Sequence, residues 1–195
     1  MIPFLLALQQ PKIESVRVNE LYYGKRSDRT SVLGRAALSG YGDLRKHRLP
    51  IGDEEVRVWG GFGTTLIQGV VLRKKGSRWT AIRLLSAPKK PTHWGLTKTY
   101  QMPRSGWPRF WKLAEHQEIF TLPDESELPQ KGKKQVLDGF SFLVEIQRKG
   151  RYRAYFYSNP KFQTQWPQAK RILEIDALLD REFIHPAAVA LPSRT

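Results

Sequence analysis

Two stretches of β-branched and aromatic residues, each interrupted by a Lys-Gly pair, constrain the fold of this chain more than any other feature. They are LIQGVVLRKKGSRWTAIRLLS at residues 66–86 and FSFLVEIQRKGRYRAYFYS at residues 140–158. Runs of this composition favour extended strands, and a glycine between two such runs favours a tight turn. Each stretch therefore predicts a β-hairpin, and the chain is expected to contain an antiparallel sheet.

The second hairpin also suggests a register. With a three-residue loop at 148–150, Gln147 faces Arg151 and Val144 faces Ala154. This pairing separates apolar from polar side chains, whereas a two-residue loop would slip the register and mix the two faces. The predicted buried face holds Phe142, Val144, Ile146, Tyr152, Ala154 and Phe156.

The opposite face of this hairpin is predicted to meet solvent. Its members are Leu143, Glu145, Gln147, Arg151, Arg153 and Tyr155. Glu145 and Arg153 lie opposite each other in this register and would form a cross-strand ion pair. We therefore expect Tyr152 and Phe156 to belong to the core, leaving the turn cations, Tyr155 and Tyr157 for a ligand.

Two segments show the spacing of amphipathic helices. The first has Pro108 in its first turn and an apolar stripe of Trp107, Phe110, Trp111 and Ala114. The second begins at Pro167 and has a stripe of Ile172, Ile175, Leu179 and Phe183. Proline is well accommodated in the first helical turn, and apolar residues three or four apart share one helix face. We predict an α+β fold, in which both helices pack on an antiparallel sheet of roughly five to seven strands.

Several of these segments together resemble an uncharacterised class of exported bacterial proteins. The resemblance covers residues 54–183 and rests on EEVRVWGGFG, GWPRFWKLAEHQEIFTLPD, DGFSFLVEIQRKGRYRAYFYSNP and WPQAKRILEIDALLDREF. It implies an exported α+β protein and no particular reaction. The incomplete leader of this chain departs from that pattern.

The two ends of the chain are set apart from the predicted single domain at residues 12–185. Residues 2–8 are apolar, as in a signal peptide, but no basic residue precedes them and Ala-Leu-Gln is a poor cleavage site. We interpret residues 1–11 as a truncated signal-peptide-like segment, and the alternative is an N-terminal strand or helix of the core. Export to the periplasm or medium is the favoured prediction over a cytoplasmic location. Residues 186–195 are predicted to form a loose tail, and no transmembrane segment is expected.

The charge of the chain points to an anionic partner. Thirty-three Lys and Arg against 18 Asp and Glu give a net charge of +15, and residues 56–114 contain no acid. Such a field attracts anionic glycans, membrane surfaces and nucleic acids. The two hairpin turns concentrate basic residues, so the candidate anion-binding residues are Lys74, Lys75, Arg148, Lys149 and Arg151. They would converge, with no acid in either loop, if both turns lie at the same end of the sheet.

Motifs for catalysis or cofactor binding are missing from the sequence. The four histidines are scattered and there is no cysteine, so no zinc motif is formed. The glycines of GGFGTT at residues 60–65 lack P-loop spacing and predict a bulge. The six tryptophans are interpreted as core residues rather than as a stacking surface. No catalytic, metal or cofactor residues are therefore predicted.

The favoured function is a non-enzymatic, exported binding or structural module with a basic face that binds a polyanion. An intracellular nucleic-acid-binding protein is the alternative. A weaker alternative is a hydrolase using a carboxylate pair from the acidic runs 53–55 or 124–127, which we expect to be solvated. The sequence leaves the oligomeric state open.

Overall fold

A computed structural model describes residues 12–15, 23–24, 31–62, 65–90, 93–136 and 139–183 of this chain. The predicted segments 1–11 and 186–195 lie outside these residues. The strands are β1 (Lys12–Ser15), β2 (Glu54–Phe62), β3 (Thr65–Lys75), β4 (Arg78–Lys90), β5 (His93–Gln101), β6 (Ser141–Arg148) and β7 (Arg151–Ser158). The α-helices are α2 (Val32–Leu38), α3 (Trp107–His116) and α4 (Pro167–Glu182), with short 3-10 helices η1 (Glu125–Glu127) and η2 (Pro160–Phe162).

All the described strands join one sheet. Their order is β1-β7-β6-β2-β3-β4-β5, and every neighbouring pair is antiparallel except the edge pair of β1 and β7. The predicted α+β class with an antiparallel sheet is therefore confirmed. Both predicted hairpins are present as β3–β4 and β6–β7. The register of β2 shifts between Gly60 and Phe62, so the glycine-rich segment contains the predicted irregularity.

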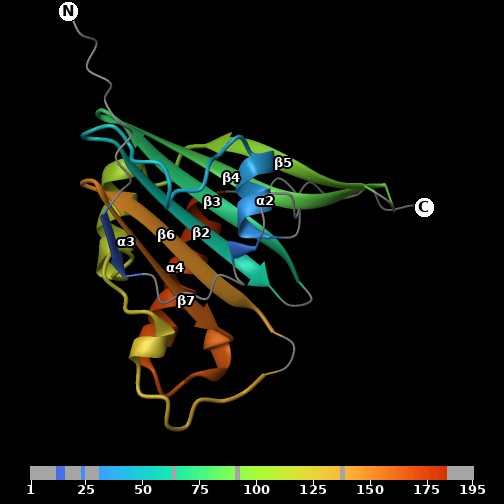
Figure 1. Ribbon diagram of the computed structural model, residues 1–195, viewed down its shortest axis with the longest axis vertical. Helices are drawn as coiled ribbons and strands as arrows, with labels where there is room; N and C mark the ends of the chain where they lie inside the picture. The colour runs from blue at the N-terminus through green and yellow to red at the C-terminus, as the bar shows by residue number, and fades with distance from the viewer. Residues whose placement is uncertain are drawn as a thin grey trace, which may run out of the picture.

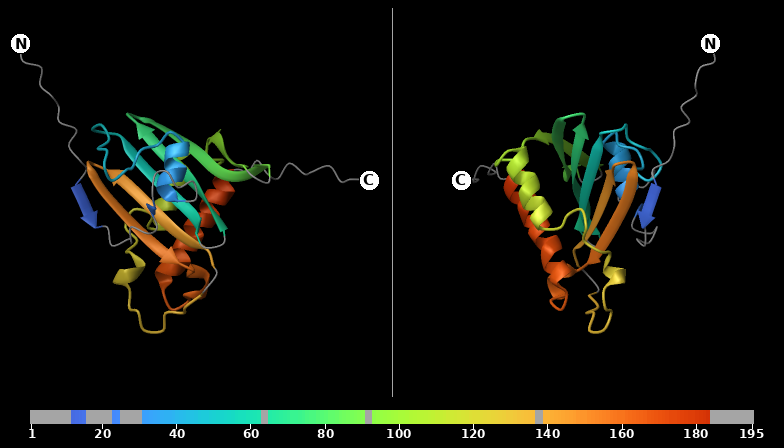
Figure 2. Two further views of the ribbon diagram at one scale, coloured as in Figure 1. Left: turned by 45° about the vertical axis from the view of Figure 1, so that its right-hand side comes forward. Right: turned by 90° about the vertical axis from the view of Figure 1, so that its left-hand side faces the viewer.

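Helices cover both faces of the sheet, whereas two helices were predicted. The right-hand view of Figure 2 shows α3 and α4 on one side of the strands and α2 on the other. The core under α3 and α4 includes Phe110 and Ile175, and the core under α2 includes Val32 and Ala36. The central strands between these helices are buried on both faces. In β2, for example, residues 55–61 are all buried.

The predicted register of the β6–β7 hairpin is wrong. Val144 lies opposite Tyr155 and Arg148 opposite Arg151, so the loop contains only Lys149 and Gly150. Both loop residues have positive φ, 52° and 72°, as a type I′ turn requires. The prediction assumed one solvent-facing side, and with both faces covered a mixed pattern of apolar and polar residues no longer discriminates between registers.

In the observed register, Tyr155 and Tyr157 lie on a different face from the one predicted, and the predicted ion pair between Glu145 and Arg153 is not formed. Tyr155 and Tyr157 are fully buried in the core under α3 and α4, so they cannot serve a ligand. Tyr152 and Phe156 are buried as predicted, but in the other core, under α2. Glu145 lies opposite Ala154 instead of Arg153.

The acidic run at 124–127 is partly buried at the edge of β7 rather than solvated. One carboxylate oxygen of Asp124 accepts a hydrogen bond from the Phe156 amide, at 2.8 Å. A carboxylate oxygen of Glu125 accepts one from the Ser158 amide, also at 2.8 Å. These side chains satisfy backbone donors of β7 beyond the stretch that pairs with β1, and so close an otherwise open strand edge.

Candidate anion-binding cleft

The two basic turns lie at the same end of the sheet. Both β3 and β6 run antiparallel to β2, so both strands end beside the start of β2 (Figure 1). Lys74 at the end of β3 lies opposite Glu54, while Gln147 near the end of β6 lies opposite Glu55. The geometric condition for convergence of the predicted cations is therefore met.

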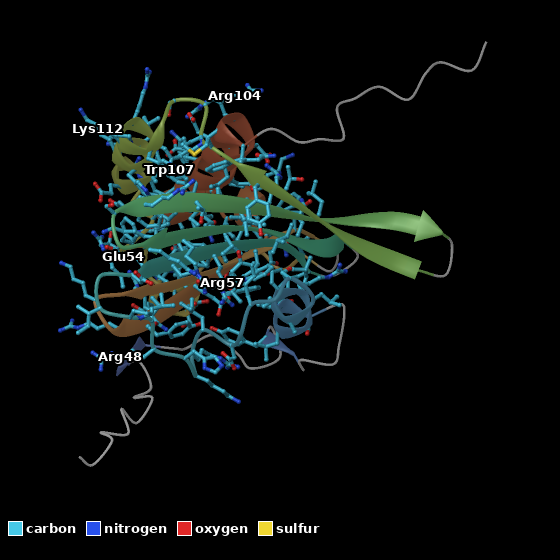
Figure 3. The ribbon with its side chains drawn as sticks, turned by 90° about the horizontal axis from the view of Figure 1, so that it is seen from above. Arg48, Glu54, Arg57, Arg104, Trp107 and Lys112 are labelled. Atoms are coloured by element: carbon cyan, nitrogen blue, oxygen red, sulfur yellow. The ribbon has the colours of Figure 1, made fainter. Side chains whose placement is uncertain are left out.

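Neither loop contains an acid, but Glu54 at the start of β2 lies between the two turns. Glu54 is 3.2 Å from the Lys74 ammonium and 2.7 Å from Nε of Arg148. The contact with Arg148 is out of hydrogen-bonding alignment and so is an ion pair only. Asp53 accepts a hydrogen bond from the Gly76 amide, at 2.9 Å. Figure 3 shows Glu54 at this end of the sheet, close to the ends of several strands.

A cleft opens beside the β6–β7 turn. It has a volume of about 510 Å³, and its lining consists of Phe120, Ile146, Arg148, Lys149, Arg151 and Arg153. We call these six residues the basic cleft. Among the described residues that line it, four are cationic and none is acidic. Three of the five predicted anion-binding residues are brought together here, while Lys74 and Lys75 lie outside the lining.

Arg153 belongs to the basic cleft because of the corrected register. Ile146 faces Arg153 across the hairpin, on the same side as the core under α3 and α4. The guanidinium donates hydrogen bonds to the carbonyl oxygens of Phe120 and Leu122. Its charge is thus held in place by neutral acceptors rather than by a carboxylate. Sequence reasoning missed this residue because it had been paired with Glu145.

A further cation, Arg48, lies against the turn between β6 and β7. A side chain at Gly150 would come within 2.7 Å of the Arg48 guanidinium, so this arginine lies directly against the turn. Figure 3 shows Arg48 at the same end of the molecule as Glu54. Glycine is favoured at position 150 by its positive φ, whereas the contact with Arg48 involves only the far end of a flexible side chain, which can shift.

A second group of charges, which we call the buried polar network, lies on the α2 face of the sheet. Its members are Glu55, Arg57, Trp59, Glu145 and Tyr152. Nε of Arg57 donates to Glu55 at 2.6 Å, and the Trp59 indole N–H donates to Glu145 at 2.7 Å. The Tyr152 hydroxyl donates to the other oxygen of Glu145 at 3.1 Å. The predicted candidate acid Glu55 is thus fully engaged inside the protein.

Burial dominates the electrostatics of this network. It raises the pKa of the Glu145 carboxyl, and Arg57, Trp59 and Tyr152 offset only part of that rise. Burial lowers the pKa of Arg57, but Glu55 and Glu145 outweigh it and hold the pKa above its ordinary value. The network is therefore a set of mutually satisfied groups with structural roles.

Two more carboxylates line a small cavity between the sheet and α4. Asp176 and Asp180 are one helical turn apart, and the cavity beside them has a volume of about 30 Å³. Arg83 donates a 2.6 Å hydrogen bond to Asp180. Burial and the neighbouring Asp180 raise the pKa of Asp176 to about 6. The cavity has room for water but not for a sugar ring.

Within the described residues, no three His, Cys, Asp or Glu side chains are grouped so that they could hold a metal ion. In the same part of the chain, no helix has both the length and the apolar character needed to cross a bilayer. Fold and site together define an α+β domain with a cationic cleft at one end of its sheet. No protein-family model matches the chain, and no curated protein matches it. The resemblance to exported bacterial proteins stays a prediction.

Proposed function

We propose that this protein is a non-enzymatic binding module that holds a polyanion in the basic cleft. One observation carries the proposal: four cationic side chains line a single concavity whose described lining contains no acid. Lys149 and Arg151 are exposed, so a ligand can reach them without rearrangement of the chain. Arg148 is also accessible, with 38% of its side chain exposed.

The electrostatics of the surroundings support the same function. One carboxylate, Glu54, is shared between two of the neighbouring cations, Lys74 and Arg148. The net charge of +15 adds a long-range attraction for polyanions. Condensed counterions are released when such a ligand binds, which gives an affinity that falls steeply with salt.

The test compares two variants with the same loss of charge. In the first, Lys149→Gln and Arg151→Gln remove two exposed cations of the basic cleft. In the second, Lys131→Gln and Lys161→Gln remove two exposed cations near the opposite end of the β6–β7 hairpin. Heparin binding is measured for both over a series of salt concentrations, together with the unfolding midpoint of each variant.

We expect the cleft variant to bind heparin about tenfold more weakly and the control variant to change little, because only the first loses cations that contact the ligand. The slope of log affinity against log salt should also become shallower by about one for each cation removed from the cleft. Equal losses from both variants would reduce the effect to net charge, and the proposed site would then be wrong.

Export stays a separate prediction, because it rests on residues 2–8, outside the described residues. We propose that the chain acts outside the cytoplasm, as its likeness to exported proteins implies. Fractionation of the native host tests this. Recovery of the chain in the cytoplasmic fraction alone would contradict export while leaving the basic cleft untouched.

A further inference from the structure

A run of aromatic side chains leads from α3 to the basic cleft. The rings of Trp107 and Trp79 are stacked with centroids 5.9 Å apart, and Trp79 is 4.4 Å from Trp111. Trp111 in turn stacks on Phe120, at 5.5 Å with 23° between the ring planes. Figure 3 shows Trp107 at the α3 side of the molecule, where this run begins. Phe120 lines the cleft, so the run ends there.

The last planar group of the run is a guanidinium. The central carbon of the Arg148 guanidinium lies 4.6 Å from the centre of the Phe120 ring. Glu54 forms an ion pair with the same group, with a carboxylate oxygen 2.7 Å from Nε. A guanidinium held by an aromatic ring on one side and a carboxylate at its edge has lost most of its freedom before any ligand arrives. Arg148 therefore presents a preorganised planar cation to the cleft.

Two kinds of recognition surface are thus placed side by side. Arg148 over Phe120 offers a plane on which a flat π system can stack. Lys149 and Arg151 are exposed cations immediately beyond it in the chain. A ligand that matches both must carry flat rings and closely spaced negative charges on one flexible chain.

Single-stranded nucleic acid has this chemistry, since its bases stack on aromatic rings and arginine planes while its phosphates bind cations. Sulfated glycans carry the charges but no flat rings. A bilayer surface presents its charges in a plane and does not enter a concave site. We propose that the basic cleft binds single-stranded nucleic acid, with a base stacked on Arg148 and adjacent phosphates at Lys149 and Arg151.

This inference rests on the proposed function and names its ligand class. It is tested with two fluorescent oligonucleotides of about twelve nucleotides, a length within the range bound by single-strand modules. One is oligothymidylate, and the other is an abasic strand with the same number of phosphates. Their affinities are measured at one salt concentration for the unmodified chain, for Arg148→Lys and for the matched control Arg151→Lys.

The unmodified chain should bind the thymidylate strand about tenfold more tightly than the abasic strand, because stacking contributes to one and not the other. Arg148→Lys keeps the charge but removes the plane, so it should bring this ratio close to one, mainly by weakening binding of the thymidylate strand. Arg151→Lys should leave the ratio as it is, because Arg151 is assigned to phosphate.

Equal affinity of the unmodified chain for both strands would overturn the inference. So would a ratio that Arg148→Lys leaves unchanged, or tighter binding of a duplex of the same length. In each of these cases, loss of heparin binding in the Lys149→Gln, Arg151→Gln variant would still support the proposed function. If that variant also bound heparin normally, both proposals would be wrong.

Discussion

The buried polar network and the basic cleft lie on neighbouring strands and both contain charged side chains. The charges of the network are buried and paired, whereas the cleft has cations at the surface. In the network, Glu55 receives hydrogen bonds from both Arg57 and Arg73, and Glu145 receives them from Trp59 and Tyr152. In the cleft, four cations line one concavity, and Glu54, the carboxylate beside Arg148, also pairs with Lys74. The first set is buried and satisfied within the protein, whereas the second presents the exposed cations Lys149 and Arg151 at the surface.

This contrast indicates where a ligand can bind on a strongly basic chain. Net charge alone marks every exposed lysine or arginine as a candidate, whereas burial separates structural charges from those that a ligand can reach. A satisfied charge contributes to the specificity of the fold, while an excess of one charge in a concavity can bind a ligand. The following experiments test this separation, beginning with the largest effect that we expect.

Breaking the buried polar network should destabilise the protein most. Arg57→Met removes the cation that pairs with Glu55 and lies 3.9 Å from Glu145. Both carboxylates remain buried with less compensation, which typically costs roughly 3–5 kcal/mol in the free energy of unfolding. Denaturant unfolding measures this loss.

The matched control is Arg151→Met in the basic cleft. This arginine is exposed, so the same substitution should change the free energy of unfolding by less than about 0.5 kcal/mol. If the two variants were equally stable, the proposed division between buried structural charges and exposed charges would be wrong.

A smaller effect is expected at Asp176, which belongs to neither set. Its pKa is raised from 3.8 to about 6 by burial and by Asp180, so the folded state holds the proton more tightly than the unfolded state does. The stability that this proton contributes is fully present below the unfolded pKa and is lost as pH rises through the folded pKa.

Asp176→Asn keeps a neutral side chain at every pH and so should stabilise the protein above the folded pKa. Allowing for partial solvent exposure, we expect a gain of about 1–2 kcal/mol at about pH 8 that vanishes at about pH 4. Unfolding curves at the two pH values measure it. A gain of the same size at both would mean that titration of Asp176 is not its cause.

Local patterns predicted the parts of the fold that depend on local chemistry. The hairpins follow from β-branched runs around Lys-Gly turns, and α3 and α4 follow from helical spacing after Pro108 and Pro167. Helix α2 was missed because its seven residues, VLGRAAL, make only about two turns and include a glycine. Such a short helix is stabilised by the sheet beneath it, which a local pattern cannot show.

The register was not predictable from alternation alone. Polar side chains at Glu145 and Gln147 suggested a solvent-facing side, but both are buried. Gln147 donates hydrogen bonds to the carbonyl oxygens of Leu44 and His47, in a loop about 100 residues away in the sequence. Polar residues inside a strand mark a solvent face only when no distant group can satisfy them.

Only part of the candidate site could be predicted, because the rest of it also depends on contacts between distant parts of the chain. Arg148, Lys149 and Arg151 were found because a turn exposes its own side chains, which is a local property. Assigning Lys74 to an ion pair required the alignment of β2 with β3, and adding Arg153 required the alignment of β6 with β7. Both alignments are set by contacts between parts of the chain that are separated in sequence.

An NMR titration of the isotopically labelled protein with a short heparin fragment tests the position of the binding site most directly. We predict saturable shifts of backbone amides concentrated at Phe120 and at residues 148–153, with much smaller shifts at Lys131 and Lys161. The amides of Arg57 and Glu145 should not move, because their charges are already compensated. Shifts of similar size at exposed lysines and arginines over the whole surface would contradict the claim that the basic cleft is the binding site.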